Sequence, residues 1–294
     1  MEEARHTHRQ EAWRSFVAML GAIALYFAAT ALAIIVSSNL PAIDRDLASV
    51  AKVTVTIALT LAAYKFGIRR LSEDGHDDLP VNRMVTGLLL GVLIGGALFA
   101  AIVGVAALLG IYRITSCCST ANLISDLAIA SIMPGFMEEL FFRGILFRWI
   151  EEMSGSWMAL VITAVLFGFA HALNPNATLF SSTAIAVEAG ILLGGAYMLT
   201  RNLWLPIGLH AAWNFTQGYL FGIPVSGVAE KGLVTSRLSG PELVTGGGFG
   251  LEASLIALVI GTAAGAWLLR LAVARGQLVQ ASWARVRHDS PAAR

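Results

Sequence analysis

Two adjacent carboxylates and an arginine lie inside a run of residues that otherwise has the composition of a membrane helix. Glu138, Glu139 and Arg143 fall within the apolar stretch from about Leu123 to Ile150. An ionised side chain at the bilayer centre costs about 3 kcal/mol on insertion scales, so such residues are rare and commonly functional. On a helix Glu139 and Arg143 share a face at i,i+4 and can neutralise each other. Glu138 is offset by about 100° and needs a partner from another helix.

Two further apolar runs carry the polar residues that could supply this partner. His171 follows Phe167 by one helical turn, and Asn214 follows His210 by one turn. Each pair therefore projects from one face of its helix. Buried polar groups in lipid need partners, and the least costly arrangement directs the three helical faces at one another.

A glutamate, two histidines and an asparagine could together hydrolyse an amide. Glu138 could act as a general base that activates a water molecule, with His171 holding the same water. His210 and Asn214 could stabilise the developing oxyanion, an effect of about 3–4 kcal/mol per donor. Alternatively, Glu138, His171 and His210 could bind a divalent metal such as zinc, and Glu139 would then be the base.

A non-enzymatic function is the main alternative. The same polar residues could connect helices in a membrane immunity or scaffold protein, or Glu138 and Glu188 could form the proton path of a small-ion carrier. Glu188 is a carboxylate within another apolar run, between Ser182 and Gly190. It could face the polar cavity or serve a hydrogen-bonded structural role.

The composition indicates an integral, multi-pass membrane protein. Hydrophobic residues make up 56% of the 294 residues and charged residues 13%, whereas an ordinary soluble domain carries roughly 25% charge. The net charge of +1 gives no basic field that would attract nucleic acid. In a prokaryote we expect the protein in the cell membrane. Cys117 and Cys118 cannot build a disulfide framework or a four-ligand metal site, and we interpret them as small apolar residues at the end of a segment.

Eight apolar runs have the length of membrane-spanning helices. They cover about residues 14–37, 47–68, 84–112, 123–150, 156–173, 183–200, 203–222 and 250–274. The first is longer than the apolar part of a signal peptide, so we interpret it as a retained helix. The sequence therefore predicts an all-α, polytopic transmembrane bundle. Glycines at four-residue spacing, such as Gly87, Gly91 and Gly95, predict close helix packing.

The charges of the connecting loops predict the orientation and the division of the chain. Arginines concentrate before the first helix, in alternate loops and after the last helix, which places both termini in the cytoplasm. We expect N-terminal helices over 1–122, a catalytic core over 123–222, an extracytoplasmic loop over 223–249, and the last helix with a basic cytoplasmic tail over 250–294. From these boundaries, His210 lies about 10 Å and His171 about 22 Å from the cytoplasmic end of its helix. We expect the site below the cytoplasmic surface.

These motifs resemble those of a known family of membrane proteases. Glu138-Glu139-x-x-x-Arg143, Phe167-x-x-x-His171 and His210-x-x-x-Asn214 follow in this order on separate membrane helices. In this they are similar to the CPBP family, which comprises CAAX proteases and bacteriocin-processing intramembrane proteases, is also called the Abi family, and includes the Ras-converting prenyl-protein endopeptidases. The resemblance covers roughly residues 123–222.

The resemblance implies a role for each motif residue. Glu138 would activate water with the help of His171, and His210 and Asn214 would stabilise the oxyanion. Glu139 and Arg143 would fix the helix and the electrostatics, and Phe167 completes the second motif. The family is commonly labelled as metalloproteases, yet a metal-free glutamate mechanism is also favoured for its prenyl-processing members.

The resemblance predicts an intramembrane endopeptidase. The chain lacks the His-Glu-x-x-His motif of site-2-type metalloproteases. Its substrates would be membrane-associated proteins or peptides, either prenylated CAAX-type chains or leader peptides, and the lipid bilayer is its other partner. The cofactor is expected to be none or a divalent metal such as zinc.

Overall fold

The computed structural model describes residues 2–41, 44–72, 75–281 and 284, with side chains from residue 10 onward. Most of this part of the chain is helical, and a helix lies at each of the eight predicted runs, which confirms the all-α fold. The end of the predicted basic tail, including 285–294, lies outside the described residues. Seven of the eight helices are α1 (Glu2–Ser38), α2 (Arg45–Phe66), α3 (Met84–Leu108), α7 (Ser156–Ala170), α8 (Leu179–Thr200), α9 (Trp204–Phe215) and α11 (Leu255–Ala274).

The eighth helical segment, over 123–154, is continuous but alternates between α and π geometry. It comprises α4 (Leu123–Ser125), a π stretch over Asp126–Ile132, α5 (Met133–Glu139), a second π stretch over Leu140–Phe147, and α6 (Arg148–Ser154). Pro134 lies in the first turn of α5 and has no N–H to donate to the preceding turn. The break in hydrogen-bond register therefore coincides with the end of the first π stretch.

Six helices of the described chain are long and apolar enough to cross a membrane. They are α1, α2, α3, α7, α8 and α11, each with its short continuation where one is present. The other two predicted spans are helical but fall outside this set. The composite helix carries charged residues, and α9 continues only through a π stretch over Thr216–Leu220. The protein is a multi-pass membrane protein.

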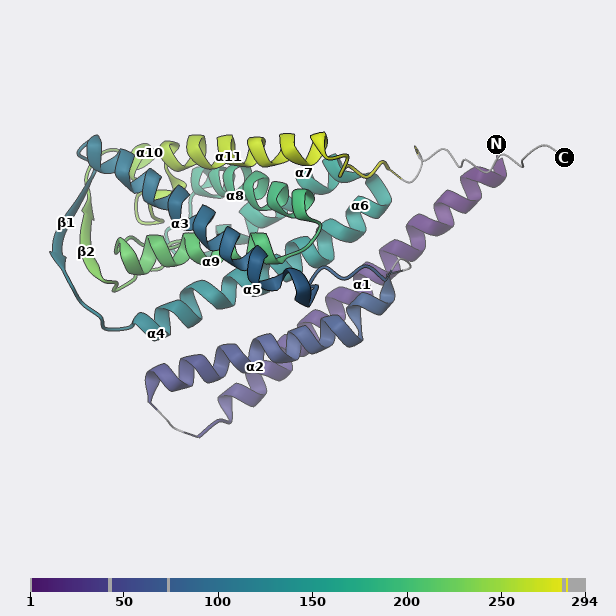
Figure 1. Cartoon of the computed structure of the whole chain (residues 1–294), viewed down its shortest axis with the longest axis horizontal. Coiled ribbons are helices and arrows are strands. Elements are labelled where there is room, and N and C mark those ends of the chain that lie inside the picture. Colours follow the sequence, from purple (N-terminus) through teal and green to yellow (C-terminus); the bar gives the residue numbers. More distant parts are fainter. Residues whose placement is uncertain (1, 42–43, 73–74, 282–283, 285–294) are drawn as a thin grey trace.

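The helices form a bundle with an inclined hairpin at its side (Figure 1). The hairpin of α1 and α2 packs against α6 and the first π stretch, while α3 lies along α9 and α8 lies along both α7 and α11. The predicted glycine packing is confirmed at these contacts. A β-carbon on Gly91 or Gly95 would overlap the backbone of α9 at Leu205 or Leu209, and one on Gly265 would overlap α8 at Leu192. Close approach of these backbones fixes where α9 presents its polar face.

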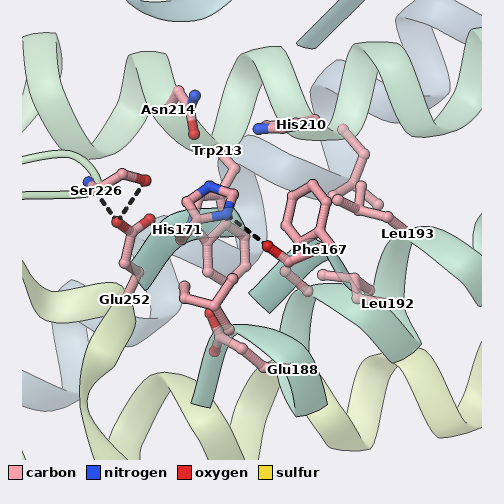
Figure 2. A pocket seen from close by; sticks show the side chains of 13 residues that line it. Phe167, His171, Glu188, Leu192, Leu193, His210, Trp213, Asn214, Ser226 and Glu252 are labelled. Carbon is pink, nitrogen blue, oxygen red and sulfur yellow. Dashed lines mark hydrogen bonds between the residues drawn. The ribbon is translucent and has the colours of Figure 1, made fainter. Parts of the chain in front are cut away.

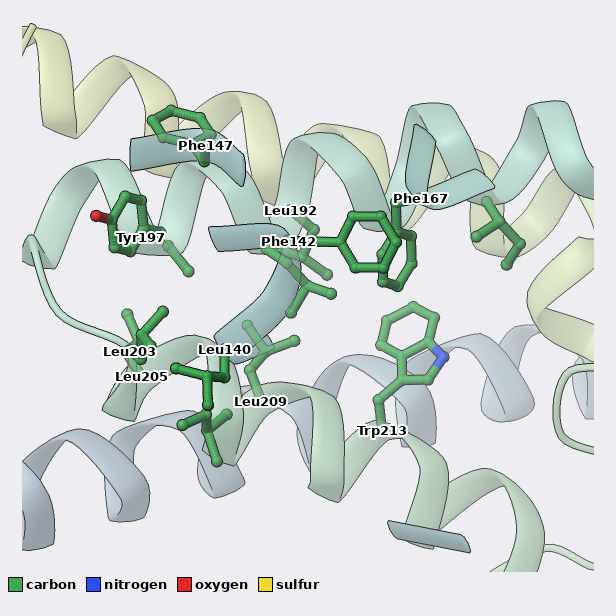
Figure 3. Packing of buried hydrophobic residues seen from close by; sticks show 14 of the residues in the cluster. Leu140, Phe142, Phe147, Phe167, Leu192, Tyr197, Leu203, Leu205, Leu209 and Trp213 are labelled. Carbon is green, nitrogen blue, oxygen red and sulfur yellow. The ribbon is translucent and has the colours of Figure 1, made fainter. Parts of the chain in front are cut away.

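A buried apolar cluster surrounds the middle of the composite helix (Figure 3). Phe142 meets Phe167 of α7 edge to face, with ring centroids 5.0 Å apart. Trp213 of α9 packs in the same way on Phe99 of α3, at 5.1 Å. Large apolar side chains on the outer faces are exposed, as on Leu93 with 67% exposure, and are expected to contact lipid.

A short β-ribbon closes one end of the bundle. Strand β1 (Tyr112–Cys117) follows α3 and pairs antiparallel with β2 (Val234–Leu238), which precedes the short helix α10 (Glu242–Thr245). Cys117 and Cys118 are exposed and joined by a disulfide. Their interpretation as small apolar residues is therefore wrong. Cys118 has a positive φ of 75°, which turns two successive side chains toward each other, and a sequence pattern does not reveal such a turn.

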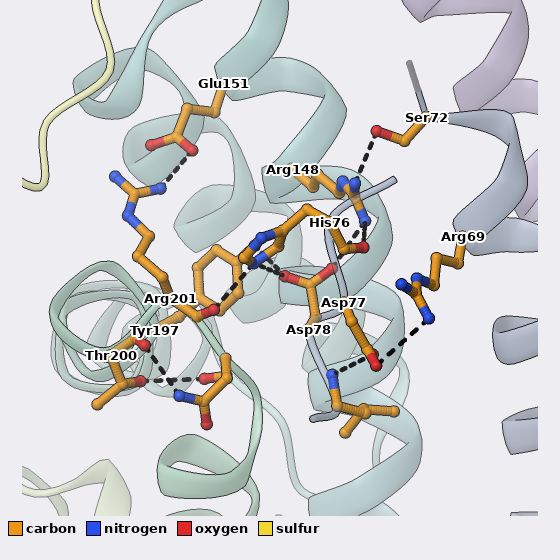
Figure 4. Close-up of polar contacts among 12 residues, drawn as sticks. Arg69, Ser72, His76, Asp77, Asp78, Arg148, Glu151, Tyr197, Thr200 and Arg201 are labelled. Carbon is orange, nitrogen blue, oxygen red and sulfur yellow. Dashed lines mark hydrogen bonds and ion pairs between the residues drawn. The ribbon is translucent and has the colours of Figure 1, made fainter. Parts of the chain in front are cut away.

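A buried polar cluster, here the Arg148 clasp, fastens the opposite end (Figure 4). Arg148 donates to Asp78 Oδ2 at 2.9 Å and to Ser72 Oγ at 2.6 Å. Asp78, with no exposed surface, also accepts from the hydroxyls of Tyr64 at 3.0 Å and Tyr197 at 2.8 Å. The clasp connects α2, the loop before α3, α6 and α8. It lies at the ends of helices that the charge pattern assigns to the cytoplasmic side.

Candidate active site

Glu138 and Glu139 lie at the end of α5, directly before the second π stretch. Interruptions of α-helical hydrogen bonding are frequent at functional sites because they redirect side chains. The two neighbours have different surroundings. Glu139 is fully buried, whereas the side chain of Glu138 is 32% exposed.

Glu139 binds two partners with one oxygen. Its Oε1 accepts from Arg143 Nη1 at 3.0 Å and contacts His210 Nδ1 at 2.9 Å. The i,i+4 pairing of Glu139 and Arg143 is as the sequence predicts. Because the carboxylate accepts the Nδ1 proton, the second ring nitrogen of His210 is free to face elsewhere.

That second nitrogen faces Glu138. His210 Nε2 lies 4.0 Å from Glu138 Oε2, and His171 Nε2 lies 3.9 Å from the same oxygen. These separations exceed a direct hydrogen bond. Glu138 Oε2 is buried and has no hydrogen-bond partner among the described residues. Glu138 therefore finds its partners on other helices, as expected.

Phe167 orders both histidines. Its backbone oxygen lies 2.8 Å from His171 Nδ1, which leaves Nε2 of His171 directed at Glu138. The Phe167 ring lies 4.7 Å from the His171 ring and 6.0 Å from the His210 ring, between centroids. The guanidinium of Arg143 lies over the Phe167 ring, with its central carbon 4.6 Å from the ring centroid.

Asn214 lies beside the histidines, but its amide group is turned. Its Nδ2 donates to the backbone oxygen of Ala130 at 3.2 Å, in the first π stretch. Its oxygen points toward the cavity in Figure 2. As an oxyanion donor, Asn214 would have to rotate its amide by 180° about the last side-chain bond.

A small cavity adjoins the histidines (Figure 2). Its volume of about 30 Å³ corresponds to roughly one water molecule. It is lined by His171 in the 3₁₀ turn after α7 (His171–Leu173), by Glu188 of α8 and by His210 and Asn214 of α9. Glu188 thus faces the polar cavity, which is one of the two alternatives left by the sequence.

Two further polar residues of the cavity were missed by sequence reasoning. Ser226 belongs to the loop after α9, and Glu252 to the 3₁₀ turn Leu251–Ala253 before α11. Glu252 accepts from Ser226 N at 2.5 Å and from Ser226 Oγ at 3.1 Å. Burial raises the pKa of Glu252, partly offset by hydrogen bonds from Ser226. Ser226 lies outside the predicted apolar runs, and Glu252 lies at the very start of the last one, so no membrane pattern draws attention to them.

The cavity lies toward one end of the bundle. Its outer wall comes from loops that adjoin the β-ribbon, at the end opposite the Arg148 clasp. In the predicted orientation this end of the bundle is the outer one, whereas we expect the site below the cytoplasmic surface, and both statements stay predictions. The different depths expected for His171 and His210 arise because α7 and α9 begin at different levels. His171 follows the start of α7 by 15 residues and His210 follows the start of α9 by six, an offset of about 13 Å.

The donor set does not fit a metal ion in this arrangement. Within the described part of the chain, no group of three or more His, Cys, Asp or Glu side chains is arranged to hold one. Glu138, His171 and His210, the predicted ligand set, lie near one another, but they are not arranged as the ligands of a metal ion. The chemistry below is therefore derived from the side chains alone.

Comparison with known proteins identifies the central part of the chain. Residues 120–216, about a third of the chain, match the model of the family "Rce1-like: Type II CAAX prenyl endopeptidase Rce1-like". The chain is also 29% identical over 86 residues to the candidate membrane peptidase YdiL of Bacillus subtilis (strain 168), over 29% of this chain and 33% of that protein. The chain thus matches about a third of the length of this curated relative. No solved structure matches.

The matched segment contains all the residues that converge around Glu138. It begins before α4 and ends at Thr216, directly after α9. Within it lie Glu138, Glu139, His171 and His210 with the geometry described above. On this segment the chain is similar to the CAAX-protease-like membrane proteins of the CPBP family.

Proposed function

We propose that this chain is an intramembrane endopeptidase that hydrolyses a peptide bond of a membrane-associated protein or peptide. The observation that carries the proposal is the approach of His171 Nε2 and His210 Nε2 to one buried oxygen of Glu138, at 3.9 and 4.0 Å. We infer that one water molecule is held among these three atoms. Residues 123–222 would form the catalytic core.

In the proposed reaction, Glu138 takes a proton from this water while the water oxygen forms a bond to the carbonyl carbon of the substrate. His171, which offers Nε2 as an acceptor, holds the water in line. The carbonyl becomes a tetrahedral oxyanion. When the C–N bond breaks, the proton held by Glu138 passes to the leaving nitrogen, so the carboxylate is restored.

His210 and Asn214 are proposed to stabilise the oxyanion. His210 can donate from Nε2 when both ring nitrogens carry protons, and its Nδ1 is held by Glu139. Asn214 can donate after rotation of its amide away from Ala130. Donors of this kind contribute about 3–4 kcal/mol each to transition-state stabilisation. Glu139, Arg143 and Phe167 position these groups and do not touch the substrate.

The family relationship supports membrane-associated substrates. Prenylated CAAX-type chains and leader peptides are both consistent with a site that lies among membrane helices, and the cavity residues do not distinguish them. The bilayer supplies the surrounding environment of either substrate class.

The proposal is tested with purified protein in liposomes that contain membrane-anchored reporter peptides, with products identified by mass spectrometry. We expect wild-type protein to cut a reporter at one bond. Glu138→Gln, which keeps the shape of the side chain but cannot accept a proton, should lower the rate at least about 1,000-fold. The control Glu242→Gln alters an exposed carboxylate of α10 and should keep the rate.

Two outcomes would contradict the proposal. Unchanged cleavage by Glu138→Gln would remove Glu138 from the chemistry. Absence of cleavage together with pH-dependent ion flux across the liposomes would favour the carrier alternative. The cleavage rate after exhaustive chelation tests whether a metal ion is required. The proposed steps require no metal ion, so this rate should be unchanged.

A further inference from the structure

Glu188 and Glu252 place two buried carboxylates against the cavity beside the catalytic histidines. Glu188 is 1% exposed and Glu252 is 3% exposed. They come from separate elements, α8 and the turn before α11, and both line the same small cavity (Figure 2). Neither belongs to the proposed hydrolytic machinery around Glu138.

The carboxylate of Glu188 is directed into this cavity and has no partner. Neither of its oxygens has a hydrogen bond within the described chain. Gly261 of α11 makes room for it, because a β-carbon at Gly261 would lie 3.2 Å from Glu188 Oε2. An unpaired carboxylate at this depth is energetically costly unless a donor binds it.

The basic side chains of the described residues that face the pair are His171 and His210, which act electrostatically on Glu252 but are held by Phe167 and Glu139. The hydrogen bonds that Glu252 accepts both come from Ser226. Arg143, the arginine of the first motif, donates hydrogen bonds to Glu139 and to the backbone oxygen of Ala189. The cavity thus has a surplus of hydrogen-bond acceptors, which is an environment that binds a cationic donor.

The size and walls of the cavity restrict the guest. About 30 Å³ accommodates a group of the size of one water molecule. The –NH₃⁺ head of a primary amine has this size and three donors. Trp213 and Phe167 also line the cavity, and aromatic rings attract a nearby cation.

We propose that Glu188 and Glu252 form an ammonium subsite that binds a primary ammonium group of the substrate or product. The source of this group rests on the proposed endopeptidase function. It is either a lysine side chain near the scissile bond or the new amino terminus. Hydrolysis yields a carboxylate and an amine, and both hydrogens of the consumed water end on the nitrogen as ammonium. A carboxylate pair next to the histidines would receive that product.

Binding is tested without turnover, with n-butylammonium as the probe. We expect n-butylammonium chloride to bind the full-length protein in detergent, measured by calorimetry and by the rise in Tm, whereas sodium butyrate and n-butanol should not. Glu188→Gln should weaken binding about tenfold or more, because a charged hydrogen bond becomes a neutral one. Glu242→Gln should bind like wild type.

A second measurement separates ligand binding from a structural role. Without n-butylammonium, Glu188→Gln should have a Tm equal to or above that of wild type, because it removes an unpaired buried charge. A lower Tm, with unchanged n-butylammonium binding, would overturn the subsite. Glu188→Gln is the variant used in this test because Glu188 has no hydrogen bonds to lose. The corresponding variant Glu252→Gln would weaken the bonds to Ser226 and could fail to fold.

Reporter peptides identify the source of the ammonium group. If it is a substrate lysine, placing lysine near the cut should raise kcat/KM for wild type but not for Glu188→Gln. If it is the new terminus, the product peptide should inhibit wild type and its N-acetylated form should not. If neither effect is seen while cleavage is normal, the subsite is contradicted and the endopeptidase proposal is not. Probe binding without any cleavage would contradict the endopeptidase proposal alone.

Discussion

Glu139 joins three parts of the site through a single oxygen. It accepts from Arg143 on its own helix and contacts His210 on α9, and both Glu139 and Arg143 are without exposed surface. The first contact could be predicted because i,i+4 spacing is local. The second could not, because it depends on how close α9 approaches the composite helix.

Breaking this buried pair should destabilise the protein. Glu139→Gln leaves the buried guanidinium of Arg143 without its charge partner, so we expect a loss of about 3–5 kcal/mol in the free energy of unfolding. The double variant Glu139→Gln, Arg143→Met should regain part of it. Chemical denaturation in detergent measures both. Equal stability of Glu139→Gln and wild type would show that the pair does not hold the helices.

Glu230 gives a pH-dependent contribution outside the membrane helices. Burial, and then the negative charge of Asp126, raise its pKa from 4.5 to about 7, while Arg45 opposes the shift. A carboxyl group with a raised folded-state pKa favours the folded state while protonated. Its contribution is complete below pH of about 4.5 and is lost as the pH rises through about 7.

Replacing this carboxyl should therefore change the pH profile. The Tm of Glu230→Gln, compared with that of wild type, should rise steadily as the pH increases from about 4.5 past about 7. Glu242→Gln, at an exposed position, is the matched control. Parallel Tm profiles for Glu230→Gln and wild type would contradict the raised pKa.

At the scale of elements, apolar length predicts where helices lie but not how they bend. All eight runs are helical, and six of these helices in the described chain are long and apolar enough to span a bilayer. The two π stretches carry no residue spacing that distinguishes π from α geometry, so a sequence pattern does not predict them. Ser226 and Glu252 reach the cavity through loops that meet only in the folded chain.

The contact between α3 and α9 should control the position of His210. Gly95→Leu would force a side chain against the backbone of Leu209, next to His210, and should lower both Tm and the cleavage rate. Gly104→Leu lies on the same helix with open space around its α-carbon, and it should change neither by much. The comparison in detergent and liposomes isolates the helix contact from helix propensity. Equal effects of the two substitutions would contradict the packing argument.

At the scale of the molecule, the two ends collect the loops that the charge pattern assigns to opposite sides. The β-ribbon joins two loops expected outside, and the Arg148 clasp joins loops expected inside. The beginning of α1 and the end of α11 also lie toward the same side of the bundle in Figure 1. This arrangement agrees with an even number of crossings.

The orientation itself is tested by labelling from one side of the membrane. In a cysteine-free background (Cys117→Ser, Cys118→Ser), Ser239→Cys beside β2 should react in intact cells with a maleimide that does not cross membranes. Arg275→Cys after α11 should react only after lysis. The reverse pattern would turn the molecule over and put the cavity end in the cytoplasm.

The central claim is that Glu138, His171 and His210 act on one water molecule as a unit. It is tested most directly by comparing cleavage rates of Glu138→Gln, His171→Gln and the double variant in liposomes. If both residues serve one water, their effects are not additive, and the double variant should be about as slow as the slower single variant. Losses that multiply in the double variant, or a fast Glu138→Gln enzyme, would contradict the shared water.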